Sequence, residues 1–142
     1  SGDRAKNHQP HTLPLGPYAA ALLARRKAGA LPGVTYVFPG SGANREGHLA
    51  EPKRAVSTIA ERSGVAFTCH DLRRTFATVC DEIGLPMLVT KRLLNHRSAG
   101  VNGGDVTAGY VVSDVERLRD PMERIEAEIL RRAGVTCPEP QP

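Results

Sequence analysis

Four polar residues, His70, Arg73, His96 and Tyr110, have side chains that together could act on a phosphodiester. An arginine fork binds phosphate in a bidentate way and keeps its charge at any working pH. A histidine exchanges protons near neutral pH, and a tyrosine can attack phosphorus once its phenol is activated. Such an attack needs cations to stabilise the charge on the pentavalent phosphorus and an acid to protonate the leaving hydroxyl. These residue types, in this order along the chain, therefore indicate a reaction at a DNA phosphodiester.

The segment that carries His70 and Arg73 has the clearest helical signals. Thr68 is a good N-cap, and Asp71 three residues later makes a capping-box-like pair with it. An apolar stripe at helical spacing predicts one buried face, made of Leu72, Phe76, Val79, Cys80 and Ile83. Gly84 predicts the helix end. Because His70 and Arg73 are three residues apart, they share a face beside this stripe, in the turns where the helix dipole favours an anion.

Each of these residues also has an ordinary structural interpretation. His70 is typical of a side chain that caps a neighbouring loop, and Arg73 is typical of an exposed cation. His96 follows an apolar helix, where a histidine interacts with the carbonyl end of the helix. Most tyrosines are packing residues with a wet hydroxyl, which is the ordinary interpretation of Tyr110. The residue types alone leave both sets of interpretations open.

Other elements must position these side chains. Proline starts, capping residues and glycine ends predict helices over residues 17–28, 51–63 and 86–95, and a further helix opened by Ser113 and Glu116. Residues 11–15 and 34–38 are predicted to be extended. Residues 97–106 contain three glycines and predict a flexible loop before Tyr110. The expected fold class is mainly α with a small β-hairpin or sheet, an α+β fold.

Length and composition predict one globular domain. The chain has 142 residues, and 40% of them are hydrophobic, which is enough for a core. Aromatic residues make up only 4%, so stacking of single-stranded bases is poorly supported. Residues 1–100 carry 14 Lys/Arg against 7 Asp/Glu, a net charge of +7, and residues 101–142 carry 5 against 8, a net charge of −3. The basic part is typical either of a surface that faces a polyanion or of ordinary solvated charge.

Cysteine usage favours a reducing compartment. Cys69, Cys80 and Cys137 are an odd number without motif spacing, and the sequence shows no signal peptide or transmembrane run. Free thiols in the cytoplasm are therefore expected, with no membrane association. A zinc site that used Cys69 and His70 would need a second spaced pair, which is missing, so no metal is expected.

The motif residues resemble those of a known family. Residues 70–78 (HDLRRTFAT), then 93–96 (LLNH) and then Tyr110 look like the catalytic domain of the tyrosine recombinases, the phage-integrase family. Residues 5–15 (AKNHQPHTLPL) are similar to the β-hairpin of that family, whose lysine corresponds to Lys6. Residues 111–125 resemble the segment that follows the nucleophile in prophage integrases. The resemblance covers about residues 3–132.

The resemblance implies a tyrosine recombinase of bacterial or phage origin, which cuts and rejoins DNA at specific sites. Tyr110 would attack the scissile phosphate, form a 3′-phosphotyrosine link and release a 5′-hydroxyl. Arg73, His70 and His96 would bind the phosphoryl group, and Lys6 would protonate the leaving oxygen. No nucleotide cofactor and no metal is implied. The implied partners are double-stranded DNA and further copies of the protein, in a tetrameric synapse on that DNA.

Two departures from the family pattern bear on the expected activity. The family has another catalytic arginine upstream of the hairpin lysine, in a Gly-x-Arg-x-x-Glu context that this sequence lacks. Residues 1–135 are therefore expected to be the C-terminal portion of an integrase catalytic domain, truncated at its N-terminus and inactive alone. Residues 136–142 are expected to be a disordered tail. The gap between His96 and Tyr110 is longer than usual because of residues 97–106, which leaves the placement of Tyr110 open.

Two other functions compete with recombination. Residues 69–95 read as helix, glycine turn and helix, which loosely matches a non-catalytic helix-turn-helix DNA-binding module. The second helix of that module would begin with apolar residues where polar base-reading side chains are needed, which counts against it. A helical interaction domain without a DNA role is the third possibility, and it leaves the coincidence of the four motif residues unexplained.

Overall fold

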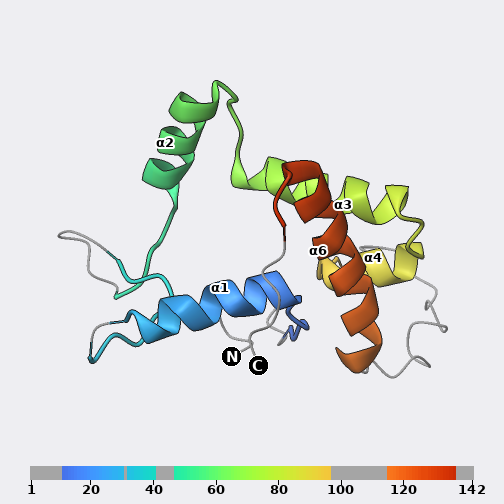
Figure 1. Ribbon diagram of the computed structural model, residues 1–142, viewed down its shortest axis with the longest axis horizontal. Helices are drawn as coiled ribbons and strands as arrows, with labels where there is room; N and C mark the ends of the chain where they lie inside the picture. The colour runs from blue at the N-terminus through green and yellow to red at the C-terminus, as the bar shows by residue number, and fades with distance from the viewer. Residues whose placement is uncertain (1–10, 31, 41–46, 97–114, 137–142) are drawn as a thin grey trace, which may run out of the picture. The chain divides into compact units, whose positions relative to one another are not determined.

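The computed structural model describes residues 11–30, 32–40, 47–96 and 115–136, which form helices joined by irregular segments (Figure 1). In chain order the helices are α1 (Pro17–Ala28), α2 (Lys53–Ser63), α3 (Cys69–Glu82), α4 (Met87–Leu93), the short 3-10 helix η2 (Val115–Leu118) and α6 (Arg119–Ala133). α1 has the predicted bounds, and α2, α3 and α4 match their predictions to within about two residues. Pro121 lies in the first turn of α6, where its missing N–H costs no helical hydrogen bond.

The expectation of an α+β fold with a small hairpin or sheet is wrong, because the residues that the structure describes contain no strand. Residues 34–38, predicted to be extended, form irregular backbone. The Leu49 N–H donates to the Phe38 carbonyl at 2.8 Å, but this bond does not continue into a ladder. A short apolar run has the composition of a strand, but a strand also needs a neighbouring strand that forms hydrogen bonds with its backbone N–H and C=O groups. Residues 11–15 are also irregular, and residues 5–10 of the predicted hairpin lie outside the described ranges.

The chain divides into two compact units. The first, called the core unit, contains residues 11–17, 75–96 and 115–136 among those described. The second, called the basic unit, spans residues 18–74 and carries nine Lys/Arg against four Asp/Glu, a net charge of +5. The rest of the chain carries ten against eleven, a net charge of −1. The positive charge of the sequence is therefore concentrated in the basic unit.

The apolar core lies in the core unit, where α3, α4, η2 and α6 contribute buried side chains. These are Val79, Cys80, Leu85, Leu93, Leu118 and Ile125, with Phe76, Ile83, Val89 and Met122 packed against them. The stripe predicted for α3 is thus confirmed from Phe76 onward. Leu72 is the exception, since it is 57% exposed. All members of the core lie after Thr75, so the first turn of α3 extends beyond the packed surface.

The turn between α3 and α4 sets the direction of α4. Gly84 ends α3 with a φ of +71°, which a residue with a Cβ rarely adopts. The Gly84 N–H donates to the Asp81 carbonyl and the Leu85 N–H to the Cys80 carbonyl, each at 2.9 Å. This pair of bonds is a Schellman motif, and it turns Leu85 into the core.

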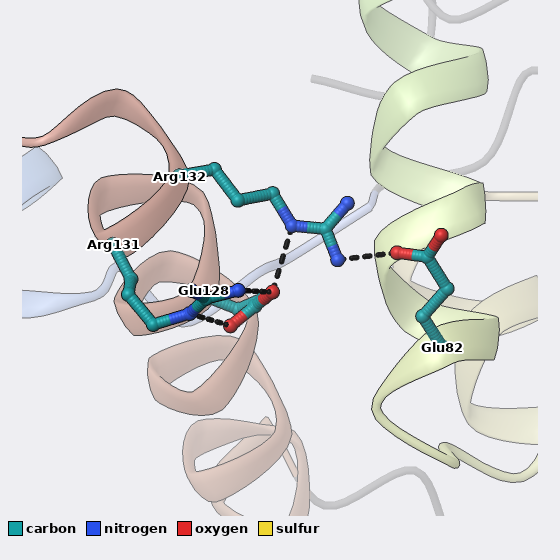
Figure 2. Close-up of polar contacts among 4 residues, drawn as sticks. All are labelled: Glu82, Glu128, Arg131 and Arg132. Carbon is teal, nitrogen blue, oxygen red and sulfur yellow. Dashed lines mark hydrogen bonds and ion pairs between the residues drawn. The ribbon is translucent and has the colours of Figure 1, made fainter.

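Polar contacts join α6 to the end of α3 in the core unit (Figure 2). Arg132 bonds the carboxylate of Glu82 on α3 and also donates to Glu128 at 2.7 Å. Arg131 binds the same Glu128 carboxylate through two bonds of 2.7 and 2.8 Å. Arg124 donates to the Ile83 carbonyl at 2.9 Å. Because Glu128 is held by two guanidinium groups, with Arg131 the stronger influence, its pKa is lowered to about 2.

The basic unit is held by fewer buried contacts, and no residue of α1 or α2 is buried. Arg26, in the last turn of α1, donates to the Val37 carbonyl at 2.9 Å and lies 4.7 Å from the Phe38 ring centre. The rings of Tyr36 and His48 lie 5.3 Å apart. The Arg26 contacts hold Val37 and Phe38 near the end of α1 within this unit.

Candidate functional site

The start of α3, where His70 lies in the first turn and Arg73 at the beginning of the second, is closed by the predicted capping box. The Thr68 N–H donates to Asp71 Oδ2 at 2.9 Å, and the Thr68 hydroxyl donates to the same oxygen at 2.7 Å. In return, the Asp71 N–H donates to the Thr68 hydroxyl at 3.2 Å. The two residues therefore satisfy backbone groups that have no partner within the helix. The helix begins where the capping residues predict it, at Cys69.

The Asp71 carboxylate accepts hydrogen bonds from Thr68 within this capping box. Hydrogen bonds from the Thr68 hydroxyl, and then from the Thr68 backbone N–H, lower the pKa of Asp71, with smaller contributions from Arg74 and His70. Arg74 Nη1 lies 3.8 Å from Asp71 Oδ1. Asp71 therefore stays ionised at neutral pH, but its charge is held by Thr68 and partly offset by Arg74. This limits its repulsion of an anion that approaches the same turn.

His70 and Arg73 are both exposed, one helical turn apart on α3. Residues with this spacing share a face of the helix. They lie in its first five residues, where the positive end of the helix dipole attracts anions. A guanidinium and an imidazole at this position can donate hydrogen bonds to the oxygens of a phosphate group.

His96 follows α4 at a well-defined turn. Asn95 has a φ of +51°, in the left-handed region that asparagine tolerates better than most residues. Its N–H donates to the Arg92 carbonyl at 3.0 Å, and the His96 N–H donates to the Lys91 carbonyl at 2.8 Å. These are the two bonds of a Schellman motif, so Asn95 plays the part that glycine plays after α3. The His96 side chain is exposed just past the carbonyl end of α4.

The structure describes three of the five predicted site residues, and these three do not all lie in the same unit. His70 and Arg73 share the start of α3 in the basic unit, and His96 belongs to the core unit. Lys6 and Tyr110 lie outside the described residues, as does the predicted loop over 97–106. Cys69, weighed above as a zinc ligand, is exposed at the start of α3. In the part of the chain that the structure describes, no three His, Cys, Asp or Glu side chains come together as metal ligands.

Two features of the described residues are not evident from the sequence. His11 Nε2 lies 2.9 Å from the Arg92 carbonyl, in the turn that precedes His96. No local pattern could predict this contact, because the two residues are 81 positions apart. A groove of about 720 Å³ lies between the end of α1 and residues 34–39. Its lining combines Leu23, Val34 and other apolar side chains with basic residues of the last turn of α1, and it includes none of the predicted site residues.

No protein-family model, curated protein or solved structure gives a significant match to this chain. Within the described ranges, no helix is both long enough and apolar enough to cross a lipid bilayer.

Proposed function

We propose that this chain contributes the phosphate-binding and nucleophilic residues of a tyrosine site-specific recombinase. The substrate is double-stranded DNA, and the reaction cuts and rejoins strands through a 3′-phosphotyrosine intermediate. Arg73, His70 and His96 bind the scissile phosphoryl group, Tyr110 is the nucleophile and Lys6 is the general acid. The proposal places the protein in the cytoplasm and has it act as a homo-oligomer on DNA.

The chemical step is a transesterification. The phenolic oxygen of Tyr110 forms a bond to phosphorus while the bond from phosphorus to the 5′ oxygen breaks. Lys6 gives its proton to that oxygen, and a histidine, His70 or His96, accepts the proton that the phenol loses during the attack. Arg73 and the histidines stabilise the charge that develops on the phosphoryl oxygens. A 5′-hydroxyl from a partner duplex then attacks the phosphotyrosine and releases Tyr110. One phosphoester bond replaces another at each step, so the reaction needs no nucleotide cofactor.

The observation that carries the proposal is the first turn of α3. The capping box fixes where this helix begins, and His70 and Arg73 are exposed on the turns that follow. A helix start with an exposed arginine and histidine is suited to an anion, because the helix dipole and the two side-chain donors act together. The net charge of +5 on the basic unit adds longer-range attraction to a polyanion.

The test is a covalent-adduct assay on the full-length gene product with a nicked duplex that traps the intermediate. Wild type should give a denaturant-stable protein–DNA adduct. Tyr110→Phe should bind the same duplex and give none, because it lacks the phenolic oxygen. Arg73→Ala should bind more weakly and reduce adduct formation by orders of magnitude, since removing one donor to a developing anion typically costs about a hundredfold or more. An adduct that survives in Tyr110→Phe would remove Tyr110 as the nucleophile.

Binding by a helix-turn-helix module is the second function that the same assay separates. Met87 and Leu88, at the start of α4, are 66% and 38% exposed. These side chains cannot read base edges by hydrogen bonds, which makes this module the weaker explanation. Salt-dependent duplex binding without any adduct from wild type would favour it. Binding with no salt dependence would exclude phosphate contacts and favour a helical interaction domain instead.

A further inference from the structure

We propose that His11 is a positioning residue that holds the turn carrying His96, an inference that rests on the proposed function. The His11 Nε2 atom lies 2.9 Å from the Arg92 carbonyl oxygen. A carbonyl oxygen can only accept a hydrogen bond, so Nε2 carries the proton and donates it. Both residues belong to the core unit, although 81 positions separate them in the chain.

The accepting carbonyl is part of the turn that presents His96. The Asn95 N–H donates to the same Arg92 oxygen at 3.0 Å, and the next N–H along the chain is that of His96. A carbonyl oxygen has two lone pairs, and here one accepts from within the turn and the other from His11. The imidazole also faces the carbonyl end of α4, where a hydrogen-bond donor is favoured by the helix dipole. His11 therefore adds a bond from a distant segment to a turn with a left-handed residue, Asn95.

The residues that follow His11 are held in place by contacts that do not involve its imidazole. Pro14 and Gly16 are buried. A Cβ at Gly16 would lie 2.5 Å from the carboxylate carbon of Glu126, so the α6 side chain occupies the space that a larger residue would need. Because these contacts do not involve the imidazole, removing the His11 ring should loosen the turn without detaching residues 12–16. The contact with Arg92 is therefore a separable constraint on the turn.

The experiment compares His11→Ala and His11→Gln with wild type by NMR on the intact chain. In His11→Ala, the amides of Asn95 and His96 should exchange roughly two- to tenfold faster, the effect of one lost hydrogen bond. A glutamine places an N–H close to the position of the Nε2 atom, so His11→Gln should restore slow exchange. His48→Ala, which removes a histidine of the basic unit, is the matched control and should leave both amides unchanged. Equal exchange in wild type and His11→Ala would overturn the proposal.

A second readout separates positioning from general stability and from the proposed function. A short DNA duplex is titrated while the ring signals of His70 and His96 are followed. His11→Ala should weaken the response of His96 severalfold and leave the response of His70 unchanged. An unaltered His96 response, or an equal loss at His70, would overturn the positioning role. If the duplex moves neither ring in wild type, the proposed function fails, while the exchange data still decide whether His11 holds the turn.

Discussion

Arg132 on α6 bonds the carboxylate of Glu82 on α3, which joins the last turn of one helix to the last turn of the other (Figure 2). The same guanidinium donates to Glu128, and Glu128 is also held by Arg131. Arg132 therefore connects a cluster within α6 to α3. The buried side chains Val79 and Ile125 belong to the same two helices. The ion pair between Arg132 and Glu82 therefore adds a polar contact between helices that also share the apolar core.

The Glu128 cluster predicts an acid-dependent loss of stability in the core unit. The folded-state pKa of Glu128 is about 2, below its ordinary value of 4.5, because Arg131 and Arg132 bind the carboxylate. A lowered carboxyl pKa contributes stability that is present above pH 4.5 and is lost as pH falls toward 2. Urea midpoints measured across this range should fall more steeply for wild type than for Glu128→Gln. Parallel pH curves for the two proteins would contradict this.

Ile125, the buried side chain of α6, predicts a large loss of stability when it is truncated. Its side chain is only 1% exposed within the apolar core. Ile125→Ala should lower the unfolding free energy by about 2–5 kcal/mol, and Ile125→Val by about 0.5–1.5 kcal/mol. Ile129→Ala, at a position that is 37% exposed on the same helix, is the control and should cost clearly less. Chemical denaturation of the three variants measures the order, and equal losses at both positions would show that α6 does not pack through Ile125.

The capping box predicts that Thr68 stabilises the start of α3. Thr68→Ala removes a hydroxyl that both donates to and accepts from Asp71, and should cost about 1 kcal/mol. Thr68→Ser keeps the hydroxyl and should stay near wild type. Amide exchange at Asp71 and Leu72 should rise in Thr68→Ala and remain slow in Thr68→Ser. Unchanged exchange in the alanine variant would mean that the helix start does not depend on its cap.

The two described cysteines should differ in reactivity. Burial raises the pKa of the Cys80 thiol, a shift that a hydrogen bond with the Thr90 side chain opposes, whereas Cys69 is exposed. The thiolate is the reactive form, so native protein treated with iodoacetamide should be alkylated at Cys69 about tenfold faster or more than at Cys80. Peptide mapping by mass spectrometry distinguishes the sites, and both should react in denaturant. Rapid labelling of Cys80 in native protein would mean that the core opens readily.

Local signals in the sequence were sufficient for α1 to α4, whereas the helix predicted to open at Ser113 and Glu116 becomes an α-helix only at Arg119, after the 3-10 helix η2. Pro17 and Gly84 mark helix boundaries where the structure has them, and the reciprocal Thr68–Asp71 pair was predictable from its spacing. These signals act within one or two turns, so they do not depend on the tertiary fold. Residues 34–38 were mispredicted because their apolar composition says nothing of a pairing partner. Leu72 continues the helical stripe but lies beyond the packed surface, and periodicity does not reveal where a core ends.

The sequence predicted the local position of single site residues but not the contacts between distant ones. The sequence placed His70 and Arg73 at a helix start, and the structure confirms that placement. It also placed His96 after a helix, but the left-handed Asn95 that forms the turn was not foreseen. The contact of His11 with the Arg92 carbonyl could not be predicted from the sequence, because a hydrogen bond across 81 positions depends on tertiary packing. Tyr110 remains a prediction from residue type and order, and Lys6 remains one from the family resemblance alone.

α3 belongs to both units, since the division of the chain falls between Arg74 and Thr75, inside the helix. Its later turns bury Val79 and Cys80, whereas its opening turns carry His70 and Arg73. Helical hydrogen bonds run across this division without a break, so fraying that begins at a weakened core can spread along the backbone. The stability of the turns that carry His70 and Arg73 therefore depends on a core cluster to which neither residue belongs. A core substitution far from His70 and Arg73 can therefore loosen the helix start on which the proposed function rests.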